Sequence, residues 1–233
     1  MKFHSLEKSL AYPYPPDSKE MPICSWEKFG HPEQLHVILN GIYNFWAKHK
    51  RIPALLNEEE ADEVLTMAKE WQASKIDAEG EEFKVDEIDV NLVKNVCKFG
   101  LTQISPACSF WGGIITQEVV KMTGKYSPLR QWLHHEFFEV LPEGDVARSH
   151  VNTRYSDYNV LFGDDFVAKA KNSSSFLIGA GALGCEFIKM FALMGFSTEG
   201  NGKVSVTDDD NIEISNLNRQ FLFRKQHVGS NKS

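Results

Sequence analysis

The stretch "FLIGAGALGCEFIKMFALMGF", residues 176–196, decides the fold of this chain. Apolar residues before the glycines predict a strand, and those after them predict a helix. Between the two, Gly179, Gly181 and Gly184 follow the GxGxxG spacing, which in a strand–turn–helix context is typical of dinucleotide-binding turns. Because "KVSVTD" at 203–208 predicts a second strand, the whole segment is expected to form a βαβ unit.

Each glycine has a physical reason to be there. The spacing predicts a tight turn at Gly179, close approach of the backbone to a phosphate at Gly181, and helix–strand packing at Gly184. The amide groups at the start of the following helix would add a favourable field for an anion. A glycine turn that is packed for structural reasons alone remains the alternative.

The residues after the second strand bear on which nucleotide is bound. Asp208, 24 residues after Gly184, suits hydrogen bonds from ribose hydroxyls, and it would repel the 2′-phosphate of NADP. That feature alone fits NAD and ATP equally. Beyond it, Asn216, Arg219 and Lys232 cluster as an enzyme that adenylates a carboxylate would need, because cations and amide donors stabilise the charge of the reacting triphosphate. The alternative is that the two cations are solvated surface charges.

The first half of the chain reads as helical. Apolar residues recur at helical spacing in 32–50, 57–75 and 85–100. Asn57 is expected to cap the second of these helices, with Glu60 three residues on. A fourth helix is predicted from Ser105 to Gly124, in which paired glycines would permit close contact with a neighbouring backbone. The remaining segments are expected to be irregular at 1–30, a strand at 133–142 and a connector at 142–153.

Composition excludes several classes of function. The chain has 233 residues, 42% hydrophobic content and a net charge of −7, which argues against a broad nucleic-acid-binding face. The sequence contains neither a CxxC nor an HExxH motif, so it gives little support for a structural metal site. The start lacks a signal peptide, and no apolar run approaches membrane length. We expect a reduced, soluble, cytoplasmic protein, with a nuclear location left open and with neither nucleic acid nor membrane as a partner.

Two strings carry a resemblance to a known family. "GAGALGCEFIKMFALMGF" and "VTDDDNIEISNLNRQFLFR", with Lys232 thirteen residues after Arg219, resemble the active adenylation half of eukaryotic ubiquitin-activating enzymes. More distantly they resemble the ThiF/MoeB-type adenylyltransferases of thiamine and molybdopterin synthesis. "PEQLHVILNGIYNFW" and "NEEEADEVLTMAKEW" are similar to the four-helix-bundle insertion of the same enzymes, and "ISPACSFWGGIITQEVVKM" to the end of their inactive adenylation half.

The resemblance covers nearly the whole chain and implies its organisation. It implies an α/β Rossmann-like start of the active adenylation domain, preceded by an all-α four-helix bundle and the C-terminal part of the inactive adenylation domain. The implied bounds are 1–104 for the bundle, 105–142 for the inactive domain, 143–152 for a connector and 153–233 for the active domain.

The resemblance also implies roles for individual residues. Asp208 would hold the ribose, while Asn216, Arg219 and Lys232 would address the triphosphate, the last two as catalytic residues. The full nucleotide-binding set it implies is Gly179, Ala180, Gly181, Gly184, Asp208, Asp210, Asn216, Arg219, Gln220 and Lys232. The magnesium ligand and the catalytic cysteine of the family are expected outside these residues.

The implied activity belongs to an intact enzyme. Such an enzyme uses Mg-ATP to adenylate the C-terminal glycine of ubiquitin, passes it to a cysteine as a thioester and then meets a ubiquitin-conjugating enzyme. This chain resembles an internal fragment, which we expect to be inactive alone. Ubiquitin is favoured over a related modifier by the bundle insertion. The alternatives are an NAD-dependent oxidoreductase and a non-catalytic nucleotide- or partner-binding module.

Several other residues are expected to have no part in the chemistry. "RYSDYNVLFG" resembles the "RYDGQ" entry to the active half but departs from it at 156–158, and the resemblance implies that Arg154 faces the inactive half. Cys24 lies in "PICSW", which imitates the family's catalytic "PICT" string but comes far too early in the chain. We expect packing roles for Cys185 and core positions for Cys97 and Cys108. His134 and His135 are expected to have surface or packing roles.

Overall fold

The computed structural model describes residues 2–17, 24–75 and 83–233. The chain divides into two compact units. The first consists of Met1–Thr102 and Gly112–Leu141, and the second of Gln103–Trp111 and Pro142–Ser233. Over the described ranges, no helix combines the length and the apolar character needed to cross a lipid bilayer.

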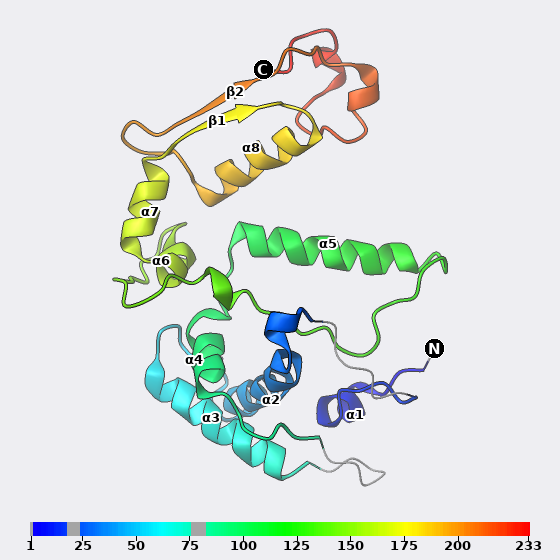
Figure 1. Cartoon of the computed structure of the whole chain (residues 1–233), viewed down its shortest axis with the longest axis vertical. Coiled ribbons are helices and arrows are strands. Elements are labelled where there is room, and N and C mark those ends of the chain that lie inside the picture. Colours follow the sequence, from blue (N-terminus) through cyan, green and yellow to red (C-terminus); the bar gives the residue numbers. More distant parts are fainter. Residues whose placement is uncertain (1, 18–23, 76–82) are drawn as a thin grey trace. The chain divides into compact units, whose positions relative to one another are not determined.

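Helices make up the first unit. Its elements are α1 (Leu6–Ala11), the 3-10 helix η1 (Trp26–Lys28), α2 (His31–His49), α3 (Glu58–Ala73) and α4 (Val90–Phe99). The three predicted helices are therefore confirmed, and Figure 1 shows α2, α3 and α4 lying together. The expectation that 1–30 is irregular is wrong for α1, where the Ser5 hydroxyl caps the helix by accepting a bond from the Lys8 amide.

Close packing of α2 on α3 holds this unit together. A Cβ added at Gly41 would lie 2.9 Å from both the Ala68 Cβ and the Val64 carbonyl oxygen, so the two helix backbones nearly touch there. Burial of apolar surface drives this packing. The core contributed by α2, α3 and α4 includes Val37, Ile38, Phe45, Ala61, Val64, Ala68, Val93, Val96 and Cys97.

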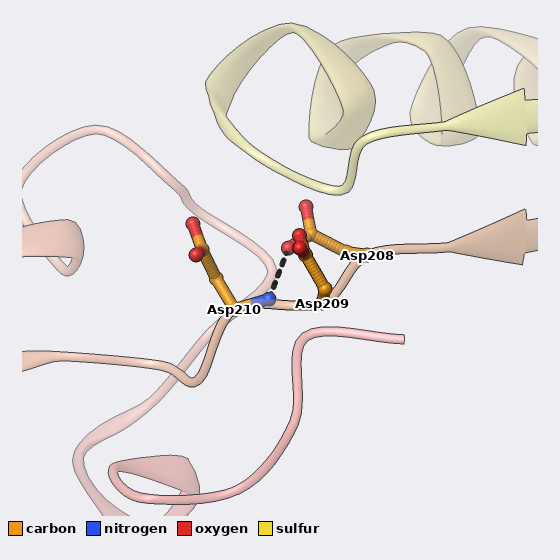
Figure 2. Close-up of side chains that lie close together, drawn as sticks. All are labelled: Asp208, Asp209 and Asp210. Carbon is orange, nitrogen blue, oxygen red and sulfur yellow. Dashed lines mark hydrogen bonds between the residues drawn. The ribbon is translucent and has the colours of Figure 1, made fainter.

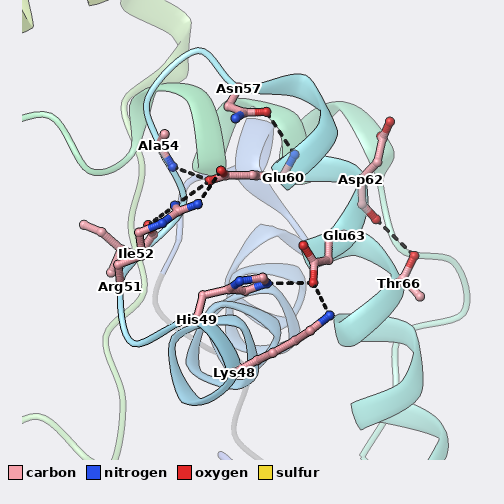
Figure 3. Close-up of polar contacts among 10 residues, drawn as sticks. All are labelled: Lys48, His49, Arg51, Ile52, Ala54, Asn57, Glu60, Asp62, Glu63 and Thr66. Atoms are coloured by element: carbon pink, nitrogen blue, oxygen red, sulfur yellow. Dashed lines mark hydrogen bonds and ion pairs between the residues drawn. The ribbon is translucent and has the colours of Figure 1, made fainter.

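Polar contacts fix the connection between α2 and α3. Asn57 caps α3 as predicted, since its Oδ1 accepts a 3.1 Å bond from the Glu60 amide. The Glu60 carboxylate in turn accepts two bonds from the Arg51 guanidinium, at 2.7 and 2.9 Å, and one from the Ala54 amide at 2.7 Å (Figure 3). Chiefly because of the Arg51 bonds, the pKa of Glu60 falls to about 2. This bidentate geometry keeps the turn into α3 ordered.

A buried histidine pair joins α2 to a distant segment. His36 is only 2% exposed, and its Nδ1 lies 3.3 Å from the Nε2 of His134, while its Nε2 donates to the Leu10 carbonyl at 2.9 Å. The rings of Trp71, Phe83 and Trp132 surround it edge-on. His134 has a packing role, as expected, but it also has a partner that the sequence did not disclose.

The prediction of a strand at 133–142 is wrong. This segment contains the 3-10 helix η2 (Phe138–Val140), and within it Glu136 accepts a 2.6 Å bond from the Phe138 amide. An isolated extended segment gains no ladder hydrogen bonds without a neighbouring strand. Side-chain contacts such as the His36–His134 bond hold it instead.

The predicted fourth helix is α5 (Ser105–Lys121), whose residues are shared between the two units. It is followed by Gly124 with φ +79°, in the left-handed region. A Cβ at Gly112 or Gly113 would meet no described atom within 4 Å, so the close backbone contact expected there is not found. Cys108 is exposed on this helix rather than in a core.

The second unit contains the predicted βαβ arrangement. It comprises α6 (Ser156–Phe162), α7 (Asp164–Lys171), β1 (Ser174–Ile178), α8 (Ala182–Met194), β2 (Lys203–Thr207) and the 3-10 helices η3 (Ile214–Asn216) and η4 (Lys225–His227). The strands are parallel and in register from Ser174↔Lys203 to Ile178↔Thr207, with α8 between them in sequence (Figure 1). Neither α6 nor α7 was predicted.

Candidate functional site

The glycine turn between β1 and α8 is held in a conformation that only glycine adopts readily. Gly179 has φ +99°, and its amide donates a 2.8 Å hydrogen bond to the Thr207 carbonyl at the end of β2. A Cβ at Gly184 would lie 2.2 Å from the Gly179 carbonyl oxygen, a distance that no real contact permits. The tight turn expected at Gly179 and the close packing expected at Gly184 are both present.

Gly181 differs from the other two glycines. Its φ is −74°, and a Cβ placed there would meet no described atom within 4 Å. The fold of the described chain therefore does not require a glycine at this position. It leaves open space beside the backbone at the N-terminus of α8, where the first amides of a helix have no intrahelical acceptors and carry the positive end of its dipole. Such a place suits an anion.

Asp208 ties the end of β2 to this turn. One carboxylate oxygen, Oδ1, accepts a 2.9 Å bond from the Asp210 amide, and the other, Oδ2, accepts a 2.6 Å bond from the Ala180 amide. These two amides, Asp210 first, lower the pKa of Asp208, and Lys232 adds to the effect. Figure 2 shows the carboxylate lying beneath the turn that follows β1. The carboxylate is therefore anionic, and it positions the Gly179–Gly181 backbone.

Lys232 lies beside the same carboxylate. Its Nζ is 2.6 Å from Oδ2 of Asp210 and 3.8 Å from Oδ1 of Asp208, and its side chain is 8% exposed. The bond to Asp210, followed by the charges of the neighbouring carboxylates, raises the pKa of Lys232. The ammonium group and the glycine turn therefore share one carboxylate neighbour, although Lys232 is 48 residues beyond Gly184 in the sequence.

The chain folds back after η4, and antiparallel pairing brings Lys232 next to Asp208 and Asp210. Asn211 and Asn231 form an antiparallel bridge, and the Ile212 amide donates to the Ser230 carbonyl at 2.8 Å. The Lys232 amide donates to the Asp210 carbonyl at 3.0 Å, which continues the same pairing. The segment that follows β2 is thus paired with residues 229–232.

The other predicted site residues lie on the loop between these paired segments. Asn216 is 8% exposed and caps η3, where its Oδ1 accepts a 3.0 Å bond from the Glu213 amide. Gln220 is 4% exposed, and its Oε1 finds no hydrogen-bond donor in the described chain. Arg219 is exposed and donates to the Ser215 carbonyl at 2.9 Å. Arg219 also donates to the Asn218 Oδ1 at 3.2 Å, whereas Lys232 donates to Asp210.

The far end of α8 is capped by residues whose role the sequence did not indicate. One guanidinium nitrogen of Arg154 donates to the Ala192 and Leu193 carbonyls at 2.6 and 2.9 Å, and the Tyr155 hydroxyl donates to the Gly195 carbonyl at 3.0 Å. A cation suits the negative end of a helix dipole. Arg154 therefore caps α8 within its own unit.

Three neighbouring carboxylates gather after β2. Asp208, Asp209 and Asp210 bring their oxygens within 4.8 Å of one another (Figure 2). Two of them already accept hydrogen bonds from backbone amides or from Lys232. Because a cation of the chain itself occupies the cluster, these residues are poorly suited to hold a divalent ion without rearrangement.

Of the four cysteines, Cys185 alone lies close to the glycine turn in the sequence, and it is buried. Cys97 and Cys185 are buried, whereas Cys24 and Cys108 are exposed. Burial, with a smaller contribution from Glu60, raises the pKa of Cys97 to about 12. Cys185 lies just after the turn and approaches the Ala180 carbonyl at 3.8 Å. Packing roles for Cys97 and Cys185 agree with this burial.

Comparison with known proteins places two segments of the chain. The sequence profile of the ThiF family matches residues 155–233, and that of the "Ubiquitin-activating enzyme E1 four-helix bundle" matches residues 1–72. The chain is 37% identical over 239 residues to the ubiquitin-like modifier-activating enzyme 1 of Oryctolagus cuniculus. It is 38% identical over 241 residues to the ubiquitin-activating enzyme E1 1 of Candida albicans. It is 37% identical over 221 residues to the ubiquitin-activating enzyme E1 1 of Arabidopsis thaliana.

These alignments cover 100%, 100% and 93% of this chain but only 22%, 23% and 20% of the respective relatives. The chain therefore spans about a fifth of the length of the proteins it matches. The matches extend from the helical first unit through to the glycine turn and Lys232, and so include both ends of the candidate site.

Proposed function

We propose that the chain carries the nucleotide-binding start of a ubiquitin-activating enzyme, because residues 155–233 match the ThiF family and residues 1–72 match the four-helix bundle of the ubiquitin-activating enzyme E1. The whole enzyme would use ATP to adenylate the C-terminal glycine of ubiquitin and then form a thioester on a cysteine. Ubiquitin and, later, a ubiquitin-conjugating enzyme would be its partners. This chain supplies part of the ATP site and is not expected to complete the reaction alone.

The single observation that carries the proposal is the meeting of a cation, a carboxylate and a glycine turn. Lys232 lies 3.8 Å from Asp208, which itself accepts a bond from the Ala180 amide of the turn. A nucleotide held on the ribose side by Asp208 would thus extend its phosphates between a helix N-terminus and an ammonium group. A purely structural glycine turn has no need for a lysine held beside it.

Two further features of the chain fit ATP. The open space beside Gly181 lets phosphate oxygens approach backbone amides without meeting a side chain. The Gln220 Oε1 is buried without a donor among the described residues, and an unmet buried acceptor costs about 1–3 kcal/mol. The exocyclic amine or a hydroxyl of the nucleotide would supply such a donor, so binding would satisfy an atom that the described residues leave unpaired.

The proposed chemistry is attack of a carboxylate oxygen on the α-phosphorus of ATP. The new oxygen–phosphorus bond forms as the bond to the leaving pyrophosphate breaks, which yields an acyl adenylate and pyrophosphate. Lys232 would neutralise charge on the phosphates, and Arg219 would add a second cation after leaving the Ser215 carbonyl. Electrostatic stabilisation of this kind is the principal contribution that a protein makes to nucleotidyl and phosphoryl transfer.

Magnesium would enter this site with the triphosphate. The carboxylates after β2 do not offer a ready cation site, because Lys232 already pairs with Asp210 at 2.6 Å. We therefore assign no magnesium ligand among Asp208, Asp209 and Asp210, and the ion would be held mainly by phosphate oxygens and water. Its contribution is to neutralise the charge of the β- and γ-phosphates.

Replacement of the two proposed triphosphate cations tests this function. We expect Lys232→Ala to raise the Kd for Mg-ATP about 10-fold or more and Arg219→Ala to raise it less, because Lys232 is held in place whereas Arg219 must move. Isothermal titration of the full chain measures both changes. Lys225→Ala is the matched control, since Lys225 lies on the same loop and is exposed. Equal affinities in Lys232→Ala, Lys225→Ala and the wild type would contradict the proposed site.

A further inference from the structure

We propose that Asp210 is a positioning residue, which holds the Lys232 ammonium where the triphosphate enters and does not itself bind the nucleotide or a metal. The inference rests on the adenylation function proposed above and assigns a role within that same site. It separates two of the three acidic residues of "DDD" by what each of them binds: Asp208 binds the turn, and Asp210 binds the lysine.

Asp210 holds Lys232 through both the main chain and the side chain. The Lys232 amide donates to the Asp210 carbonyl at 3.0 Å, and Nζ donates to Oδ2 at 2.6 Å. The lysine side chain is only 8% exposed. A lysine in solution loses much rotamer freedom when it binds a ligand. In this chain the Lys232 side chain is already ordered before the nucleotide binds. The entropy cost of binding is therefore smaller, and the affinity is higher.

The pairing leaves the ammonium group available to a phosphate. An ammonium has three N–H donors, of which the bond to Asp210 uses one. The Asp208 Oδ1 is too distant, at 3.8 Å, to take a second donor in a normal hydrogen bond. Two donors therefore remain for phosphate oxygens while Asp210 keeps its hold.

Repulsion between Asp210 and the phosphates is the effect that opposes this role. The Asp210 side chain is 70% exposed, so water and salt screen its charge. The bond to Lys232, by contrast, is short and its lysine partner is shielded from solvent. Positioning therefore outweighs repulsion, and loss of the carboxylate should weaken ATP binding rather than strengthen it.

A double-mutant cycle tests whether Asp210 acts through Lys232. We measure the Kd for Mg-ATP of the full chain with Asp210→Ala, Lys232→Ala and both together. We expect about 5-fold weaker binding for Asp210→Ala, and no further loss, within about 2-fold, when it is added to Lys232→Ala. Asp209→Ala is the matched control, because Asp209 is the adjacent exposed carboxylate, and it should bind ATP as the wild type does.

A nucleotide-free measurement tests the positioning directly. We expect an amine-acylating reagent to modify Lys232 several-fold faster in Asp210→Ala than in the wild type or in Asp209→Ala, because the ammonium is released and loses a neighbouring negative charge. The exposed Lys225 of the same loop is the internal reference for reagent strength. Mass spectrometry of peptides reports both lysines in one sample.

The two measurements separate failure of this inference from failure of the proposed function. Unchanged acylation of Lys232 in Asp210→Ala would overturn the inference, as would an equal loss of ATP affinity when Asp210→Ala is made in the Lys232→Ala background. Failure of the wild-type chain to bind ATP would instead remove the proposed function, and the faster acylation would still establish that Asp210 positions Lys232.

Discussion

Gly184→Ala is expected to destabilise the second unit by about 2 to 4 kcal/mol. The added Cβ would lie 2.2 Å from the Gly179 carbonyl oxygen and 3.0 Å from its carbonyl carbon. Both are backbone atoms, so neither can rotate away, and α8 would have to move off the glycine turn. Amide hydrogen exchange of β1 and β2 in the full chain, measured at increasing urea concentrations, reports the loss of unfolding free energy in this unit directly.

Gly181→Ala provides the matched control for the same turn. A Cβ there would meet no described atom within 4 Å, and its φ of −74° is ordinary for alanine. We expect the unfolding free energy from hydrogen exchange to change by less than about 0.5 kcal/mol. ATP affinity should nevertheless fall, because a methyl group would fill the space for phosphate. Equal destabilisation by the two substitutions would contradict the distinction between a packing glycine and a phosphate-facing glycine.

The second large effect is expected when the pH falls. Burial lowers the pKa of His36 to about 4 and that of His134 to about 3, from an ordinary value near 6.5. The unfolded chain therefore binds protons at a higher pH than the folded chain does. Stability is complete above pH 6.5 and is lost as the pH falls from 6.5 toward the folded pKa values. Each of the two histidines should remove on the order of 2 to 3 kcal/mol by pH 4.5, so the pair should remove about 5 kcal/mol.

Denaturant unfolding between pH 7 and pH 4.5 measures this effect in a suitable window. Glu60, whose pKa is about 2, contributes stability that is present above about pH 4.5 and is lost only below it, so it does not confuse the measurement. His36→Gln, which can still donate to the Leu10 carbonyl, should flatten the pH dependence, whereas His150→Gln, at an exposed position, should not. NMR titration of the wild-type histidines checks the same pKa values if a variant does not fold. If the pH dependence of the unfolding free energy is unchanged in His36→Gln, the buried histidine pair is not its cause.

The parts of the fold that sequence predicted were encoded by short-range patterns. Gly179 and Gly184 were found because a left-handed turn and a close helix contact leave very few residue choices. Asn57 was found as a cap because capping depends on only four consecutive residues, 57–60. The helices 32–50, 57–75 and 85–100 were found because their apolar faces repeat every three to four residues.

The parts that sequence missed depend on long-range contacts. His36 and His134 are 98 residues apart and have no spacing that discloses their bond. The bond from the Ala180 amide to Asp208 and the pairing of Lys232 with Asp210 arise only once the chain after β2 folds back. The "VGSNK" segment offers turn residues as a faint signal of that return. The strand expected at 133–142 does not form because the strands of the described residues, β1 and β2, pair with each other and offer this segment no partner.

The most direct test of the central claim is a competition titration of the wild-type chain with Mg-ATP and NAD. Both nucleotides suit a glycine turn with a ribose-binding aspartate, but only ATP has a triphosphate that makes use of the Lys232 ammonium beside Asp208. The account predicts that Mg-ATP binds and that NAD displaces it only at much higher concentration. Tighter binding of NAD than of ATP would contradict it.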